Sequence, residues 1–215
     1  MVVRFNDVRT MADLMDRLGD VSPRRVRVHP TFGSATLADI ERSRKEDGVV
    51  CEVVDGYLVE KTMGLEESSL AGYLLGLLNL FVIPRNLGKV TGSDGTVQIA
   101  ADLVRIPDVA FFAWDRLPQR RMPKKPVPNV IPNLAIEILS RWNTKREMAI
   151  KRKEYFAAGV ELVWEINPRK RTVAVYASPA KGVTLTEEDI LDGGAVLPGF
   201  QLPLKDLFGE LDRQG

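Results

Sequence analysis

Cysteine and histidine are almost absent from this chain. Cys51 is the only cysteine and His29 the only histidine among the 215 residues. A single cysteine excludes a disulfide or a cysteine zinc site within the chain, and such usage is typical of a reducing cytoplasm. A single histidine excludes two-histidine metal sites, and most serine or cysteine triads unless His29 is the base. Acid–base chemistry would therefore depend on carboxylates, lysines or metal-bound water.

The chain also lacks a large charge excess and a long hydrophobic run. Its formal net charge is +1, so affinity for nucleic acid would have to come from local patches. The longest apolar stretch, "LAGYLLGLLNLFVIP", is broken at Pro84 and is too short to span a bilayer. The start "MVVRFNDVRT" has no signal-peptide core. We therefore expect a cytoplasmic protein that does not associate with membranes.

What is present is the pattern of an α/β protein with enough apolar residues for one sizeable core. Periodicity predicts helices at 9–19, 36–47, 65–82 and 144–158. Strands are predicted at 24–30, 88–93, 95–101, 103–113, 134–139, 161–167 and 172–177, and a hairpin at 51–63 turns at Asp55-Gly56. This order favours a mixed sheet with helices on its faces. We expect an N-terminal extension at 1–47, and a main domain at 48–215 that ends in short strands.

Two carboxylates stand in apolar runs that read as buried strands. In "RIPDVAFF", Asp108 shares a strand face with Ala110, and in "NLAIEILS", Glu137 shares a face with Ala135. Burying an unpaired carboxylate is costly, so each requires a partner. If the two strands are neighbours, the carboxylates converge and repel unless a proton or cation lies between them. Oxygen ligands of this kind suit Mg²⁺ or Mn²⁺.

A lysine on the following helix completes the pattern. Met148, Lys151 and Tyr155 fall on one helical stripe, which places Lys151 on or near the face toward the sheet. A lysine facing two carboxylates can orient or help to deprotonate a metal-bound water and can stabilise charge on a phosphate. A purely structural reading stays open, in which Glu137 pairs with an arginine and Lys151 is solvated.

The order of these segments resembles a known family. The quoted acids, the stretch "CEVVDGYLVEK" and the stretch "EMAIKRKEYFAAGVELVWEINPRKRTVAVY" are similar to the Uma-type restriction endonucleases of the PD-(D/E)xK nuclease superfamily. The similarity runs through about residues 36–180, and "EYFAAGVELVWEINP" carries its most specific part. The resemblance implies the restriction endonuclease-like fold, a central mixed sheet flanked by helices, and a divalent-metal site.

The resemblance also implies roles for individual residues. Asp108 matches the aspartate of the family's PD dipeptide and Glu137 its second acid, and these two would hold the metal. The superfamily pattern expects a lysine two residues after that acid, but this chain has Leu139 there. Lys151 matches a lysine that the family carries on the next helix. Glu52 and Glu67 are auxiliary candidates, either of which could complete the metal shell or be structural.

The sequence therefore predicts a Mg²⁺- or Mn²⁺-dependent endonuclease that hydrolyses DNA, with Asp108, Glu137 and Lys151 as catalytic residues. The loop at 114–133 carries basic residues that could contact phosphates or simply be solvated: Arg116, Arg120, Arg121, Lys124 and Lys125. A homodimer would suit cleavage of both strands, although no residue pattern demonstrates one.

Two other classes of function stay open. A nucleic-acid-binding module without catalysis would keep the basic surface and show no turnover. An interaction protein that keeps only the fold would satisfy its acids with arginines such as Arg105.

Overall fold

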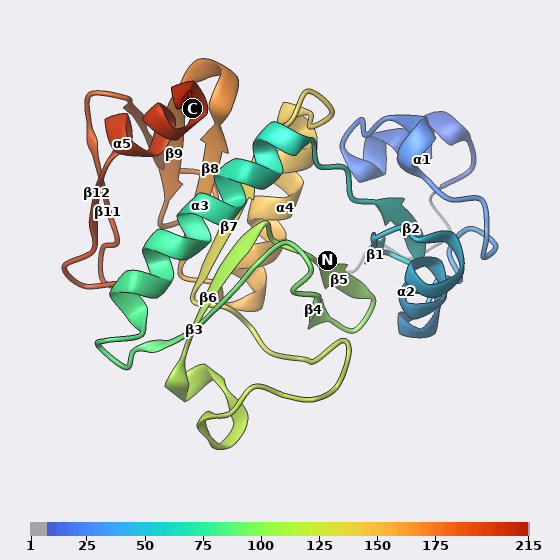
Figure 1. The fold of residues 1–215 in the computed structure, drawn as a ribbon. Helices are drawn as coiled ribbons and strands as arrows, with labels where there is room; N and C mark the ends of the chain where they lie inside the picture. Colours follow the sequence, from blue (N-terminus) through green and yellow to red (C-terminus); the bar gives the residue numbers. More distant parts are fainter. Residues whose placement is uncertain (1–7, 215) are drawn as a thin grey trace.

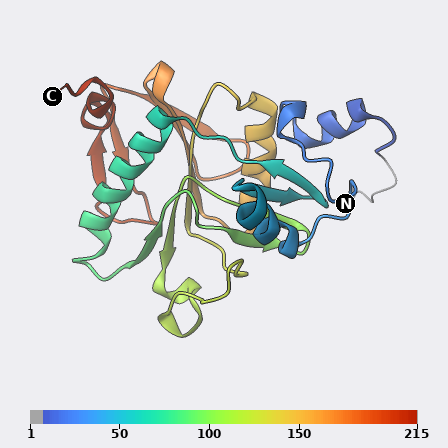
Figure 2. The same cartoon turned by 45° about the vertical axis from the view of Figure 1, so that its right-hand side comes forward.

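Two β-sheets lie beside each other in the computed structural model, which describes residues 8–214 (Figures 1 and 2). The central sheet has the strand order β10-β9-β8-β7-β6-β3. Its strands are β3 (Gly88–Thr91), β6 (Val109–Ala113), β7 (Leu134–Ile138), β8 (Leu162–Asn167), β9 (Thr172–Tyr176) and β10 (Gly182–Thr186). The sheet is mixed because β7 and β8 pair in parallel, whereas the other neighbours pair antiparallel.

The smaller sheet is antiparallel and has the order β2-β1-β5-β4. Its strands are β1 (Cys51–Val54), β2 (Tyr57–Glu60), β4 (Val97–Ala100) and β5 (Leu103–Arg105). The predicted hairpin between β1 and β2 is confirmed. Asp55 and Gly56 both have positive φ, 51° and 76°, as a two-residue type I′ turn requires. A separate antiparallel sheet of two strands, β11 (Ile190–Asp192) and β12 (Gln201–Pro203), lies near the C-terminus.

Helices cover both faces of the central sheet, as Figure 1 shows. On one face lie α3 (Leu65–Val82) and α5 (Leu204–Gly209), and on the other lies α4 (Lys145–Ala158). Helices α1 (Met11–Leu18) and α2 (Leu37–Arg42) pack instead against the smaller sheet. The apolar side of α3 packs on alternate strand residues such as Phe111 and Ile136. Tyr155 of α4 packs on the opposite face, against Ala110 and Ala135. Because side chains alternate along a strand, β6 and β7 contribute residues to the hydrophobic core under α3 and also to the core under α4. The fold is the α/β arrangement that the sequence predicts.

The ends of α4 are specified locally. Thr144 accepts a hydrogen bond from the Glu147 N–H, and the Glu147 carboxylate bonds the Thr144 N–H in return, which forms a capping box. Gly159 ends the helix in the left-handed conformation. Because α4 is the crossover between the parallel strands β7 and β8, its position is tied to the acid-bearing end of β7.

Two predicted strands differ from the structure. The run 103–113 is not one strand: it divides into β5 and β6, which belong to different sheets. Pro107 stands at the break and has no N–H for a strand ladder. The predicted strand 24–30 is also wrong, because Pro23–Arg25 form a 3₁₀ turn and Val26 makes only an isolated bridge to Val59.

Within residues 8–214, no helix is both long enough and apolar enough to cross a membrane.

Candidate active site

Asp108, directly before β6, lies opposite Glu137 of the neighbouring strand β7. Val109 of β6 pairs with Ile136 of β7, so Asp108, which directly precedes β6, continues the same register toward Glu137. The Asp108 N–H donates to the Ile136 carbonyl at 2.9 Å, and Asp108 Oδ2 accepts from the Ile138 N–H at 2.6 Å. Each acid is only 3% exposed. The structure therefore brings the two predicted acids together near the end of β7.

Lys151 lies between Glu137 and Glu52. Its Nζ is 3.4 Å and 3.5 Å from the two carboxylate oxygens of Glu137, and 3.1 Å from Glu52 Oε1. Tyr155, one turn further along α4, donates its hydroxyl to Glu137 Oε1 at 2.6 Å. Met148, Lys151 and Tyr155 are all buried, as the predicted helical stripe requires. Glu52, an auxiliary candidate, therefore contacts the lysine.

Lys61 is a member of the cluster that the sequence analysis did not identify. It follows β2, and its Nζ is 2.8 Å from Asp108 Oδ1 and 2.5 Å from the Ile106 carbonyl oxygen. Lys61 is therefore the ion-pair partner of Asp108, just as Lys151 is an ion-pair partner of Glu137. No local pattern marks it, since "LVEKTM" places an ordinary lysine just after a strand. Lys61 comes close to Asp108 because the β1–β2 hairpin pairs through β1 with β5, the strand that precedes Asp108.

The cluster contains more negative than positive charges. Arg105 extends it, because its guanidinium contacts both Glu52 and Glu154. Four carboxylates and three cations take part: Glu52, Asp108, Glu137, Glu154, Lys61, Arg105 and Lys151. With every group ionised, one negative charge is in excess, which a bound cation or a proton would relieve.

The pKa values of Glu137 and Glu52 move in opposite directions in this cluster. Burial raises the pKa of Glu137 above its ordinary value; Lys151 opposes the rise, and the Asp108 charge adds to it. Burial also disfavours ionised Glu52, but Lys151 and then Arg105 outweigh it and lower the pKa of Glu52 to about 2. Burial likewise disfavours the Lys151 ammonium, yet Glu137 and Glu52 hold the pKa of Lys151 above its ordinary value. Glu137 and Glu52 therefore favour the charged, hydrogen-bond-donating form of Lys151.

The donor atoms of the cluster suit a hard divalent cation. Asp108 and Glu137 offer carboxylate oxygens, and Mg²⁺ is generally held by one or two carboxylates together with waters and substrate phosphates. Within residues 8–214, no three histidine, cysteine or acidic side chains are grouped to hold a metal. Because Lys61 occupies Asp108 Oδ1, a cation at that atom would have to displace the ammonium.

Residues before β1 hold both lysine-bearing elements. Arg25 Nη2 is 2.9 Å from Glu147 Oε1, and Arg25 Nε donates to the Glu60 carbonyl at 2.9 Å. Glu147 lies one turn before Lys151, and Glu60 directly precedes Lys61. Because Arg25 and Glu147 are buried at 5% and 3% exposure, their ion pair is shielded from water. Arg25 thus connects the backbone next to Lys61 to helix α4, which carries Lys151.

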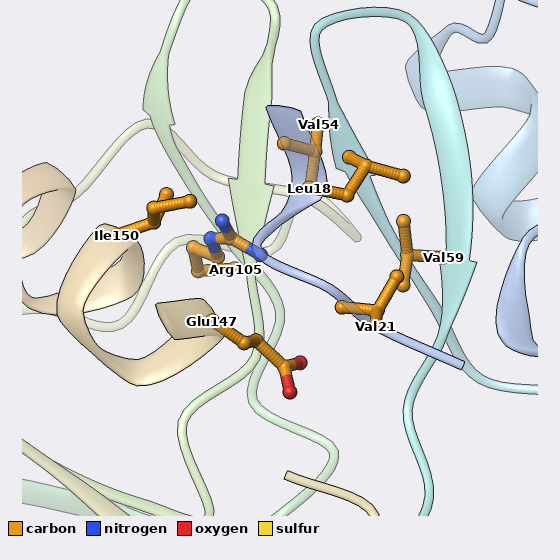
Figure 3. A pocket seen from close by; sticks show the side chains of 7 residues that line it. All are labelled: Leu18, Val21, Val54, Val59, Arg105, Glu147 and Ile150. Carbon is orange, nitrogen blue, oxygen red and sulfur yellow. The ribbon is translucent and has the colours of Figure 1, made fainter. Parts of the chain in front are cut away.

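A small pocket marks this junction, and Figure 3 shows the side chains that line it. Leu18 and Val21 come from the N-terminal segment, whereas Arg105 comes from β5 and Glu147 from α4. Close by, Thr144 Oγ1 donates to the Gly19 carbonyl at 2.5 Å. A Cβ on Gly19 would lie 2.6 Å from the Glu147 nitrogen, so the N-terminal segment approaches the first turn of α4 backbone to backbone.

The remaining predicted residues are Glu67 and the basic loop at 114–133. Glu67 is half-buried in the first turn of α3, and within residues 8–214 no hydrogen bond or ion pair joins it to Asp108, Glu137 or Lys151. The basic loop follows the end of β6 that is remote from Asp108, and it lies at the lower end of the sheet in Figure 1. Its exposed cations are Arg120, Arg121, Lys124 and Lys125.

Comparisons with known proteins agree with this architecture. A family model described as "Uma2: Putative restriction endonuclease" matches residues 37–205. A crystal structure described as a "putative nuclease belonging to DUF820", from Anabaena variabilis ATCC 29413, is similar, with a TM-score of 0.68 and 21% sequence identity. The similarity covers 76% of this chain and 92% of that one, and at this identity it shows the fold. A comparison with curated proteins found no match.

Proposed function

The chain belongs to the Uma2 family, and we propose that it is a divalent-metal-dependent endonuclease that hydrolyses phosphodiester bonds in DNA. One observation carries the proposal beyond the family. Two buried acids, Asp108 and Glu137, meet at one end of the central sheet, and the Lys151 ammonium lies within 3.5 Å of Glu137. Each of these charges is costly to bury, and together they supply the groups that metal-assisted hydrolysis requires.

In this proposal, Asp108 and Glu137 hold Mg²⁺ or Mn²⁺, which would polarise the phosphate and acidify a water. Lys151 donates hydrogen bonds and stabilises negative charge that develops on the phosphate. Its position is fixed by Glu52 at 3.1 Å, while the Tyr155 hydroxyl orients Glu137. Because Leu139 cannot supply the expected charge, the lysine comes from α4 rather than from β7.

The test is cleavage of supercoiled plasmid and of single-stranded DNA with Mg²⁺ or Mn²⁺. We expect Asp108→Asn, Glu137→Gln and Lys151→Met each to lower the rate at least about 100-fold, as loss of one stabilising donor typically does. Asp115→Asn is the matched control, because Asp115 is an exposed acid in the remote loop. Equal rates for the wild-type protein and Asp108→Asn would refute the proposed function.

A second candidate is a nucleic-acid-binding protein that has lost catalysis. The observation in its favour is that Asp108 and Glu137 each already have a lysine partner. This alternative predicts DNA binding without turnover, and no Mn²⁺-dependent rise in melting temperature. Calorimetric titration with Mn²⁺ separates the two candidates, since only the nuclease requires Asp108 and Glu137 to bind the ion.

A further inference from the structure

An open groove of about 490 Å³ runs along the α4 side of the central sheet. Leu139, Met148 and Glu165 are among the residues that line it. Glu165 of β8 is the parallel register partner of Glu137, and adjacent strands are about 4.8 Å apart. Leu139 follows Glu137 by two residues. The groove is therefore lined by the strand neighbour of Glu137, while Asp108, Glu137 and Lys151 do not line it themselves.

The interior charges of the groove neutralise each other. Arg152 Nη1 is 2.5 Å from Glu165 Oε1, and the Arg152 guanidinium also lies 3.9 Å from the centre of the Tyr176 ring. The Arg152 Nε donates to the Pro179 carbonyl at 2.8 Å. These contacts fix Arg152 in the wall of the groove, so this arginine is not available to an incoming ligand.

Three further cations line the groove without a partner. Lys145, Arg169 and Lys170 are exposed, and within residues 8–214 no ion pair or hydrogen bond involves the charged groups of their side chains. The Lys170 backbone N–H donates to Asn167 Oδ1 at 3.0 Å, which leaves the ammonium free. Lys145 begins α4, whereas Arg169 and Lys170 belong to the turn between β8 and β9. The groove thus carries three positive charges that no acid compensates, and they come from two different elements of its wall.

These cations lie at the same end of the sheet as the acids. Strands β7 and β8 are parallel, so the turn after β8 and the start of α4 after β7 lie together, at the upper end of the sheet in Figure 1. The basic loop follows β6, whose five residues carry the chain about 17 Å away from Asp108. Of the two basic surfaces, the groove is therefore the one at the same end of the sheet as Glu137.

We propose that this groove binds the sugar–phosphate backbone of the DNA strand beside Glu137, through Lys145, Arg169 and Lys170. The inference rests on the proposed function and identifies where its substrate lies. Phosphates are the anionic groups repeated along a nucleic acid, and cations placed on two elements can contact successive phosphates of one chain. Contacts of this kind position the strand and carry no sequence information.

The test is the salt dependence of DNA binding, measured by fluorescence anisotropy in EDTA on full-length Asp108→Asn protein. Three phosphate contacts contribute about 2.7 to the slope of log K against log[salt] for a duplex, and about 2.1 for a single strand. We expect the triple variant Lys145→Gln/Arg169→Gln/Lys170→Gln to lose most of that slope and at least tenfold in affinity at low salt. Because all three side chains are exposed, melting temperatures should stay unchanged.

The matched control is the triple variant Arg120→Gln/Arg121→Gln/Lys124→Gln, which removes the same charge from the remote loop. It should change the slope by less than 1. A groove variant with the wild-type slope would refute the proposal, as would loss of the slope in the loop variant alone. Because binding is measured without metal or turnover, this outcome is independent of the cleavage test.

Discussion

Lys61 and Asp108 form an ion pair that is almost entirely buried. Nζ lies 2.8 Å from Oδ1, and the two side chains are 9% and 4% exposed. Because Asp108 is also a proposed metal ligand, the ammonium and a divalent cation would compete for the same carboxylate oxygen. The pair therefore makes Lys61 a determinant of metal affinity as well as of stability.

Lys61→Met should weaken the fold and strengthen metal binding at once. Removing one partner of a buried pair typically costs about 3–5 kcal/mol, measurable as a lower urea midpoint. Without the competing ammonium, Mn²⁺ should bind more tightly in calorimetric titration than it does to the wild-type protein. Lys153→Met, an exposed change on α4, is the control. Weaker Mn²⁺ binding by a folded Lys61→Met protein would contradict this competition.

Glu137→Gln should stabilise the metal-free protein. The folded-state pKa of Glu137 is raised, chiefly by burial, so the folded chain holds that proton more tightly than the unfolded chain does. Ionised Glu137 therefore opposes folding above its unfolded pKa, and glutamine removes this effect while still accepting the Tyr155 hydrogen bond. Lys151 keeps Glu52 as a partner at 3.1 Å, so the change leaves no buried charge unpaired. A melting temperature at pH 7 that exceeds the wild-type value, with Glu188→Gln unchanged, is the expected result.

Bound Mn²⁺ should raise the melting temperature of the wild-type protein but not that of Glu137→Gln. At a concentration 100 times Kd, Mn²⁺ stabilises a folded protein by about 2.7 kcal/mol. That corresponds to roughly 5–11 °C for a chain of this size. The wild-type protein should show this rise and Glu137→Gln should not. An equal rise in both proteins would remove Glu137 from the metal site.

Residues whose signal is periodic could be placed from the sequence. Alternation along "NLAIEILS" put Glu137 on an inward face, and helical spacing put Lys151 on the same stripe as Met148 and Tyr155. The capping box at Thr144 and the glycine at 159 fix the ends of α4 through local contacts alone. Features of this kind depend on neighbours in the chain, so one sequence suffices to predict them.

Features that depend on long-range pairing could not be placed. Lys61 reaches Asp108 only because β1 pairs with β5, and no local pattern encodes that contact. The run 103–113 is apolar enough for one strand, and its division between two sheets follows from Pro107 and from tertiary pairing. The separation of the basic loop from the acids likewise appears only once the direction of β6 is known.

Glu52→Gln should destabilise the protein in a pH-dependent way. The pKa of Glu52 falls to about 2 in the folded state from an ordinary value of 4.5, so ionised Glu52 stabilises the fold above pH 4.5. The variant should lose on the order of 3 kcal/mol at pH 7. That difference should shrink as the pH falls from 4.5 toward 2. Urea unfolding across this range, with exposed Glu41→Gln as control, provides the measurement; a pH-independent difference would exclude the electrostatic cause.

Arg25→Met should loosen both lysine-bearing elements. Arg25 is the buried partner of Glu147 and also bonds the Glu60 carbonyl, so its loss leaves a buried carboxylate unpaired at a cost of about 3–5 kcal/mol. Arg24→Met is a matched control one residue away, because Arg24 is exposed. The double variant Arg25→Met/Glu147→Gln should recover part of the lost stability, since no unpaired charge remains.

The same variants test whether the segment before residue 37, which the family model does not match, acts on the site. If Arg25 positions α4 and the end of β2, Arg25→Met should lower kcat for DNA cleavage more than it changes KM, at a temperature where the protein stays folded. Arg24→Met should leave both constants at wild-type values. An unchanged kcat in folded Arg25→Met protein would show that the N-terminal segment supports the fold alone and leaves the two lysines where they are.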